Sequence, residues 1–215
     1  MVLDTKRSAV DPILIKFAKL FSSISPDMIT WLALLCAIVA AGFFYVSNPG
    51  NELQFSFLLF ASLFVFLNGL FDAVDGKLAK LRHLSSKRGD FLDHAIDRFA
   101  DVFIVGGLAL SPWCHLEIGF FAMIGMLLTS YMGTQAQAVG MKRLYAGLLG
   151  RADRLAILIF APVIQHGLFR FYSISTIYGY SLLDWVLLFI AIIGTFTAVQ
   201  RFVMTLLSFK KKSED

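Results

Sequence analysis

The sequence predicts an all-α integral membrane protein, with six transmembrane helices preceded by an N-terminal amphipathic helix at the membrane interface. The chain has 215 residues, of which 58% are hydrophobic and 16% are charged, and its mean hydropathy is +0.74. A soluble domain of this size could not bury so much apolar surface. The apolar residues lie in stretches of about twenty, the length that a helix needs to cross about 30 Å of hydrocarbon. This composition excludes a soluble enzyme.

The N-terminal segment, residues 1–24, differs from the stretches that follow. Asp11-Pro12 predicts a helix cap followed by the first helical residue, and Lys16 and Lys19 then interrupt an apolar run. A helix with lysines in the headgroups and apolar side chains in the acyl boundary lies in the membrane interface. We therefore expect an interfacial amphipathic helix. The alternative is a longer, tilted first span.

Six apolar stretches predict one membrane domain over residues 25–208, followed by a polar tail at 209–215. The expected spans are residues 26–46, 53–81, 90–110, 117–139, 154–171 and 182–208. Ser25-Pro26 marks the first start, because serine is a common helix cap and proline fits the first helical turn. An even number of spans places both ends of the domain on one side of the membrane.

Lysine and arginine residues gather on that same side. The N-terminal segment and the regions 77–89, 140–154 and 201–212 hold 17 of the 19 basic residues. The positive-inside rule makes this side the cytoplasm. The net charge of +4 then reflects a basic collar facing anionic membrane lipids, with no sign of a nucleic-acid surface. We expect a cell-membrane protein with both termini in the cytoplasm.

Aspartates inside the second and third predicted spans indicate a functional site, because ionisable residues there are costly. Asp72 and Asp75 lie three residues apart, and Asp93 and Asp97 lie four apart, so each pair shares a helix face. If the intervening turn brings these faces together, four carboxylates converge just below the cytoplasmic surface. They could not stay ionised together without cations. All-oxygen ligands favour Mg²⁺ or Mn²⁺, and we expect two ions, although Ca²⁺ could use the same ligands.

Two other interpretations stay open at this point. The aspartates could form a structural network with nearby lysines and arginines, and Asp101 in particular is spaced to pair with Arg98. A cation transporter could use intramembrane aspartates to bind its ion. Transporters of that kind usually have inverted repeats and helices interrupted at the midplane, and the sequence contains no internal repeat.

The spacing of the aspartates also matches a family signature. The chain reads Asp72-x-x-Asp75-Gly76-x-x-Ala79-Lys80, then eight residues, then Gly89-x-x-x-Asp93-x-x-x-Asp97. This closely resembles the signature of the CDP-alcohol phosphotransferases, membrane enzymes that move a lipid phosphate from a CDP-activated donor to an alcohol and release CMP. Lys80 stands where the family usually has arginine. Residues 26–30, Pro-Asp-Met-Ile-Thr, resemble the family's Pro-Asn-x-x-Thr element near the nucleotide.

The resemblance implies roles for these residues. Asp72, Asp75 and Asp93 would hold the metal ions that bridge the diphosphate of a CDP-lipid donor. Asp97 would take the proton of the acceptor hydroxyl and could also touch a metal. The positions implied near the nucleotide and its diphosphate are Asp27, Thr30, Gly76, Lys80 and Gly89. The resemblance also implies a homodimer.

Polar and basic residues at the cytoplasmic ends of the later spans predict a pocket for the phosphate of the acceptor. They are Gln135, Lys142, Arg143, Arg151, Arg154 and Arg201. The stretches Gly-Thr-Gln-Ala-Gln at 133–137 and Gly-Arg-Ala-Asp-Arg at 150–154 resemble the inositol-phosphate branch of the family, above all the archaetidylinositol phosphate synthases. We therefore expect inositol 1-phosphate as acceptor, with glycerol 3-phosphate as the alternative. The loop cations could instead anchor lipid headgroups.

Overall fold

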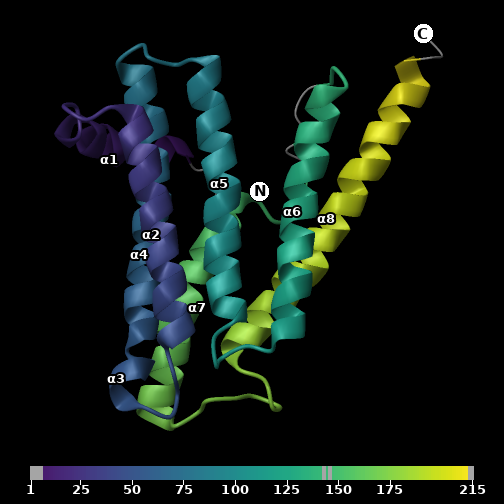
Figure 1. Ribbon diagram of the computed structural model, residues 1–215. Coiled ribbons are helices and arrows are strands. Elements are labelled where there is room, and N and C mark those ends of the chain that lie inside the picture. The colour runs from purple at the N-terminus through teal and green to yellow at the C-terminus, as the bar shows by residue number, and fades with distance from the viewer. Residues whose placement is uncertain (1–6, 142–143, 145–146, 213–215) are drawn as a thin grey trace.

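The computed structural model describes residues 7–141, 144 and 147–212 (Figure 1). Within these residues the secondary structure is helical, apart from one isolated bridge between Ile177 and Tyr180. The helices are α1 (Arg7–Leu20), α2 (Pro26–Val46), α3 (Glu52–Phe55), α4 (Phe57–Leu81), α5 (Lys87–Ala109), α6 (Leu116–Ala138), α7 (Arg151–Tyr172) and α8 (Leu182–Lys212). The predicted all-helical class is confirmed.

Capping residues explain where the helices begin. The Ser25 side chain accepts a hydrogen bond from the amide of Met28, and α2 begins at Pro26 as predicted. Ser86 accepts from the amide of Gly89, so α5 begins at Lys87, three residues before the expected start. Likewise α7 begins at Arg151 and not at residue 154.

Two expected boundaries were wrong in other ways. Helix α1 begins at Arg7, so Pro12 lies inside it and removes one backbone hydrogen bond near its start. Helix α8 continues to Lys212, into the expected tail. The expected span 53–81 has the bounds of the apolar segment Leu53–Leu81, within which a turn at Ser56 separates α3 from α4. Phe55, the last residue of α3, stacks on His166 of α7 at 4.3 Å between ring centroids.

The helices form two packed groups that meet at α5. Helix α2 packs along α4 and α5, α4 packs along α7, and α6 packs along α8. In Figure 1 α5 stands between α2 and α6, and the α6–α8 pair spreads away from the others toward the end where α4 turns into α5. Glycines allow close crossings: a Cβ at Gly107 would lie 2.5 Å from Ala41 Cα, and one at Gly194 would lie 2.9 Å from the Gly125 carbonyl carbon.

Within the described residues, five helical segments are long and apolar enough to cross a membrane, which is consistent with an integral membrane protein. They are Pro26–Val46, Leu53–Leu81, Leu116–Ala138, Arg151–Tyr172 and Leu182–Phe209. Helix α5 is as long as α6 but carries the aspartates. Large apolar side chains such as Phe121, Phe160 and Phe196 are exposed on the outside of the bundle, as a lipid-facing surface requires. The count of six spans and the orientation stay predictions.

Helix α1 lies across the bundle near the α4–α5 turn (Figure 1). Ala18 is fully buried and belongs to a small apolar cluster with Val74 and Leu78 of α4. Asp11 forms an ion pair with Lys77 of α4 at 3.0 Å. Because Ile13, Phe17 and Leu20 of the same helix are exposed, α1 carries an unburied apolar face, and its place at the membrane interface remains a prediction.

Candidate active site at the aspartate cluster

Three aspartates meet in the half of the bundle that ends in the α4–α5 turn. Asp72 and Asp75 lie on α4, and Asp93 lies on the second turn of α5. Each offers one carboxylate oxygen, and these oxygens all lie within 4.8 Å of one another. Asp75 is buried and the other two are half-buried. The α4–α5 hairpin thus concentrates negative charge from both helices at one point.

One oxygen of this cluster has no partner within the described part of the chain. Asp93 Oδ1 is buried and accepts no hydrogen bond there. A buried carboxylate oxygen without a donor is costly, and hard divalent cations prefer all-oxygen ligands. Asp72, Asp75 and Asp93 therefore fit Mg²⁺ or Mn²⁺, and a bound ion would satisfy the orphaned oxygen.

Thr30 of α2 orients one member of the cluster. Its buried hydroxyl lies 2.5 Å from Asp75 Oδ2 and 3.1 Å from the carbonyl oxygen of Pro26. Donation to the carboxylate fixes the rotamer of Asp75 in the way that groups behind a metal ligand usually do. Sequence reasoning assigned Thr30 to the nucleotide, and only the packing of α2 on α4 shows its contact with Asp75.

Asp97 lies one turn beyond Asp93 on α5, and an arginine joins it to the cluster. Arg151 Nη1 lies 2.7 Å from Asp97 Oδ1 and 2.7 Å from Asp72 Oδ2. Arg98 Nη2 lies 3.7 Å from the other oxygen of Asp97. Arg151, which the sequence assigned to the acceptor phosphate, thus bridges aspartates of α4 and α5 from the first residue of α7.

Asp101, one further turn along α5, is surrounded by arginines. It lies 2.9 Å from Arg98 Nη1, 3.4 Å from Arg151 Nε and 3.4 Å from Arg154 Nη2. The pair with Arg98 is the structural ion pair that the spacing predicted. The sequence did not predict the contacts of Asp101 with Arg151 and Arg154 of α7. Their signal was the continued four-residue spacing from Asp93 through Asp97 to Asp101, which places all three on one helix face.

The other residues assigned to the nucleotide and its diphosphate lie around the α4–α5 turn. Asp27 forms an ion pair with Arg88 at 2.6 Å, and the Gly89 amide donates to Ser86 as part of the α5 cap. Lys80 is exposed. A Cβ at Gly76 would meet nothing within 4 Å, so open space lies beside this part of α4.

The residues assigned to the acceptor phosphate are only partly brought together. Arg151 and Arg154 meet at Asp101. Arg201 of α8 is buried against α6, where it donates to the Thr129 carbonyl at 2.6 Å. Gln135 is exposed near the end of α6. Lys142 and Arg143 lie outside the described residues.

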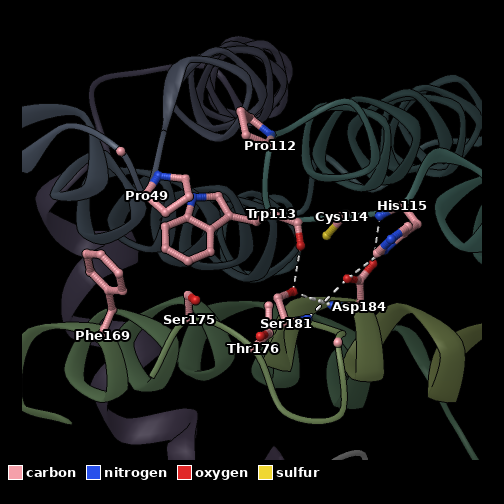
Figure 2. A pocket seen from close by; sticks show the side chains of 12 residues that line it. Pro49, Pro112, Trp113, Cys114, His115, Phe169, Ser175, Thr176, Ser181 and Asp184 are labelled. Atoms are coloured by element: carbon pink, nitrogen blue, oxygen red, sulfur yellow. Dashed lines mark hydrogen bonds and ion pairs between the residues drawn. The ribbon is translucent and has the colours of Figure 1, made fainter. Parts of the chain in front are cut away.

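A hollow of about 480 Å³ lies at the opposite end of the bundle, between the α5–α6 loop and the start of α8 (Figure 2). Its polar groups bond to one another. Ser181 Oγ donates to the Trp113 carbonyl at 2.6 Å, and Asp184 accepts from the amides of His115 at 2.7 Å and Ser181 at 3.2 Å. These bonds connect the α5–α6 loop to the start of α8, so the polar groups that form them have a structural role.

The signature aspartates Asp72, Asp75 and Asp93 thus form a carboxylate cluster fit for a divalent ion, with Arg151 of α7 beside it in an all-helical bundle. The chain belongs to the CDP-alcohol phosphatidyltransferase family, whose model matches residues 23–197. Membership in a transferase family gives the cation-transporter alternative no support.

Two relatives in this family match the chain over most of its length. The chain is 29% identical to an archaetidylinositol phosphate synthase of Pyrococcus horikoshii over 163 residues, which cover 76% of this chain and 79% of the relative. It is 28% identical to an archaetidylinositol phosphate synthase of Methanothermobacter thermautotrophicus over 201 residues, which cover 92% and 88%.

Solved structures have the same fold. The phosphatidylinositol phosphate synthase of Mycobacterium tuberculosis with CDP-DAG bound superposes with a TM-score of 0.70 and 22% identity, covering 90% of this chain and 94% of that one. The same enzyme in complex with manganese and citrate gives a TM-score of 0.70 at 22% identity, covering 91% and 88%. At this identity the likeness establishes the architecture.

Proposed function

We propose that the protein transfers a phosphatidyl or archaetidyl group from a CDP-lipid to a hydroxyl of inositol 1-phosphate and releases CMP. The observation that carries this proposal is the position of Arg151, which joins Asp72 of the aspartate cluster to Asp97, with Arg154 next to it at Asp101. Transfer from a diphosphate to a phosphorylated alcohol needs two neighbouring sites for negative charge. The aspartates offer one through a metal ion, and the arginines offer the other. The names of the relatives support the same acceptor.

The donor site is formed by the α4–α5 hairpin. Asp72, Asp75 and Asp93 hold Mg²⁺ or Mn²⁺, and we expect two ions in the loaded enzyme. Bound there, the metal supplies positive charge against the donor diphosphate and the departing CMP. The open side of Gly76 gives a nucleotide room to approach the α4 backbone. Asp27, Lys80 and Gly89 line the same turn, and Thr30 acts behind Asp75.

Asp97 is the general base. It lies on the face of α5 between the metal ligands and Asp101, with Arg151 Nη1 at 2.7 Å. An ionised carboxylate at this position can accept a proton. As Asp97 takes the proton of the acceptor hydroxyl, the hydroxyl oxygen forms a bond to the lipid-side phosphorus. The phosphorus–oxygen bond to CMP breaks, and CMP leaves with the electron pair.

The acceptor phosphate binds at the start of α7. Arg151 contacts Asp97 directly, Arg154 lies beside it at Asp101, and Arg154 Nε is buried without a hydrogen-bond partner in the described residues. A phosphate oxygen would satisfy that donor. Gln135 of α6 and Arg201 of α8 are further proposed members of this pocket, and Lys142 and Arg143, which lie outside the described residues, are proposed from the sequence alone. Glycerol 3-phosphate would meet the same charges, so it remains the second candidate.

The reaction takes place at the cytoplasmic face of the cell membrane, where the basic residues of the chain gather. There a lipid donor held in the bilayer and a water-soluble acceptor can reach one site. The surrounding partners are membrane lipids, and the resemblance to the family supports a homodimer.

The test is a parallel acceptor assay. Purified protein with Mg²⁺ and either a diacyl or an archaeol CDP-lipid is offered inositol 1-phosphate, glycerol 3-phosphate, serine or inositol, and CMP release is measured. We expect turnover with inositol 1-phosphate. Preference for glycerol 3-phosphate would make it the acceptor in place of inositol 1-phosphate. Failure of all four acceptors with both donors would overturn the proposal.

A further inference from the structure

Asp101 is a buried carboxylate that holds three guanidinium groups from two helices. Only 4% of the residue is exposed. Arg98 approaches it from α5 itself, and Arg151 and Arg154 approach it from the first turn of α7. Helix α7 packs mainly on α4 and α8. The ion pairs of Asp101 are therefore a direct link between α5, which carries the proposed base, and the start of α7.

The arginines depend on this carboxylate for their positions. Three guanidinium groups at one point repel each other strongly in a site shielded from water, and Arg154 is itself only 4% exposed. Removing the shared counter-charge would leave the buried Arg154 without its ion pair, and Arg98 and Arg151 with only their ion pairs to Asp97 and Asp72, so the three cations would turn away from one another. Asp101 thus stabilises an arrangement that the arginines could not keep alone.

The contacts of Arg151 show what this arrangement does. Its Nε faces Asp101, and its Nη1 faces both Asp97 and Asp72. Contacts at two nitrogens fix the plane of a guanidinium group. Nη2 takes part in none of these three contacts, and its direction follows from the two nitrogens that are fixed. Asp101 thereby determines where the cationic edge of Arg151 lies relative to Asp97.

We propose that Asp101 is a positioning residue for the phosphate of the acceptor: it orients Arg151 and Arg154 so that the acceptor hydroxyl meets Asp97. The inference rests on the proposed function, because it presumes a phosphorylated acceptor. Asp101 touches neither substrate nor metal. Its effect reaches the reaction through the two arginines of α7, and it should therefore alter acceptor binding far more than donor or metal binding.

The decisive variant is Asp101→Asn, which keeps the size of the side chain and removes its charge. Its KM for inositol 1-phosphate should rise by about 10-fold or more, the scale of a lost charged hydrogen bond. Inhibition by inorganic phosphate, measured as competition with the acceptor, should weaken in parallel. The KM for CDP-lipid and the affinity for Mn²⁺, measured by titration without substrates, should stay within about 2-fold. Asp101→Glu should recover part of the acceptor affinity.

Asp184 provides the matched control. It is also a buried aspartate with several donors, but it lies at the other end of the bundle. Asp184→Asn should lower the thermal unfolding temperature and leave the KM for inositol 1-phosphate unchanged. If Asp101→Asn changed stability in the same way and left both acceptor KM and phosphate inhibition unchanged, Asp101 would be a structural residue and the inference would be wrong. An equal rise in both substrate KM values would also overturn it.

Two further outcomes stay informative. If Asp101→Asn does not fold, Asp101→Glu takes its place, and an acceptor KM equal to that of the unaltered protein contradicts the inference. If the unaltered protein uses glycerol 3-phosphate, phosphate inhibition still tests Asp101, and a loss of inhibition in Asp101→Asn supports it. Failure of the unaltered protein with every phosphorylated acceptor would overturn the proposed function first and this inference with it.

Discussion

The two ends of the helix bundle both bury aspartate side chains, but they compensate the negative charge in different ways. At the end formed by the α5–α6 loop, the single carboxylate of Asp184 accepts hydrogen bonds from backbone amides of His115 and Ser181 and lies 3.0 Å from the His115 ring. At the end with the α4–α5 turn, three aspartates share one point and Asp93 Oδ1 has no partner in the described part of the chain.

This difference distinguishes a structural carboxylate from a functional one. Asp184 belongs to a helix cap, and a backbone amide donates to each of its oxygens, so nothing needs to be added. The aspartate cluster has more negative charge than its neighbours can neutralise, even with Arg151 beside it. Buried aspartates occur at both ends of the bundle. Only the cluster at the α4–α5 end has an excess of negative charge, and that excess predicts a bound cation and a reaction.

The largest effect is expected for Asp97→Asn, because an amide cannot accept the proton of the acceptor hydroxyl. Turnover should fall by about 100-fold or more, while CDP-lipid still binds. CMP release and a binding measurement with labelled CDP-lipid check this. Asp184→Asn is the control at the other end and should turn over normally. Activity close to normal in Asp97→Asn would exclude Asp97 as the base.

The second largest effect is expected for metal binding, which should depend on the aspartate cluster and not on Asp184. Saturating Mn²⁺ at about 100 times its dissociation constant stabilises the folded state by about 2.7 kcal/mol, so the unfolding temperature should rise. Asp75→Asn should lose this rise, and a chelator should abolish it in the unaltered protein together with activity. Asp184→Asn should keep the rise in full. If Mn²⁺ raised the unfolding temperature of Asp75→Asn as much as that of the unaltered protein, the ion would bind elsewhere.

Thr30→Val should weaken Mn²⁺ binding by about 10-fold, the lower end of the range for groups that hydrogen-bond to a metal ligand. The valine has nearly the shape of threonine but cannot donate to Asp75. Thr30→Ser keeps the hydroxyl and serves as the control. Titration of each variant with Mn²⁺ measures the change, and equal affinities in the two variants would contradict the role of Thr30.

The smallest effect is expected at the other end. Ser181→Ala removes the donor to the Trp113 carbonyl and the acceptor for the amide of Asp184. Stability should fall by about 1 kcal/mol, as for other helix caps, with kcat and both KM values unchanged. Thermal unfolding and CMP release test this together. A change in kcat would show that the two ends are coupled.

Local patterns predicted much of the fold. Apolar stretches long enough to cross a membrane, and the cap at Ser25 with Pro26 after it, predicted the helices and the start of α2. The contact of Phe55 with His166, more than a hundred residues away, was not predictable in this way. A propensity or a period describes neighbours in sequence and contains nothing about partners on a distant helix.

The same division applies to the site. The sequence by itself determined that this is a helical chain with aspartates three and four residues apart on two helices, because spacing along a helix defines which residues share a face. Only the tertiary structure decided that Thr30 holds Asp75, that Arg151 bridges Asp72 and Asp97, and that Asp101 holds the arginines of α7. Those contacts depend on how α2, α4, α5 and α7 are rotated against one another, and side-chain packing along their whole lengths sets that rotation.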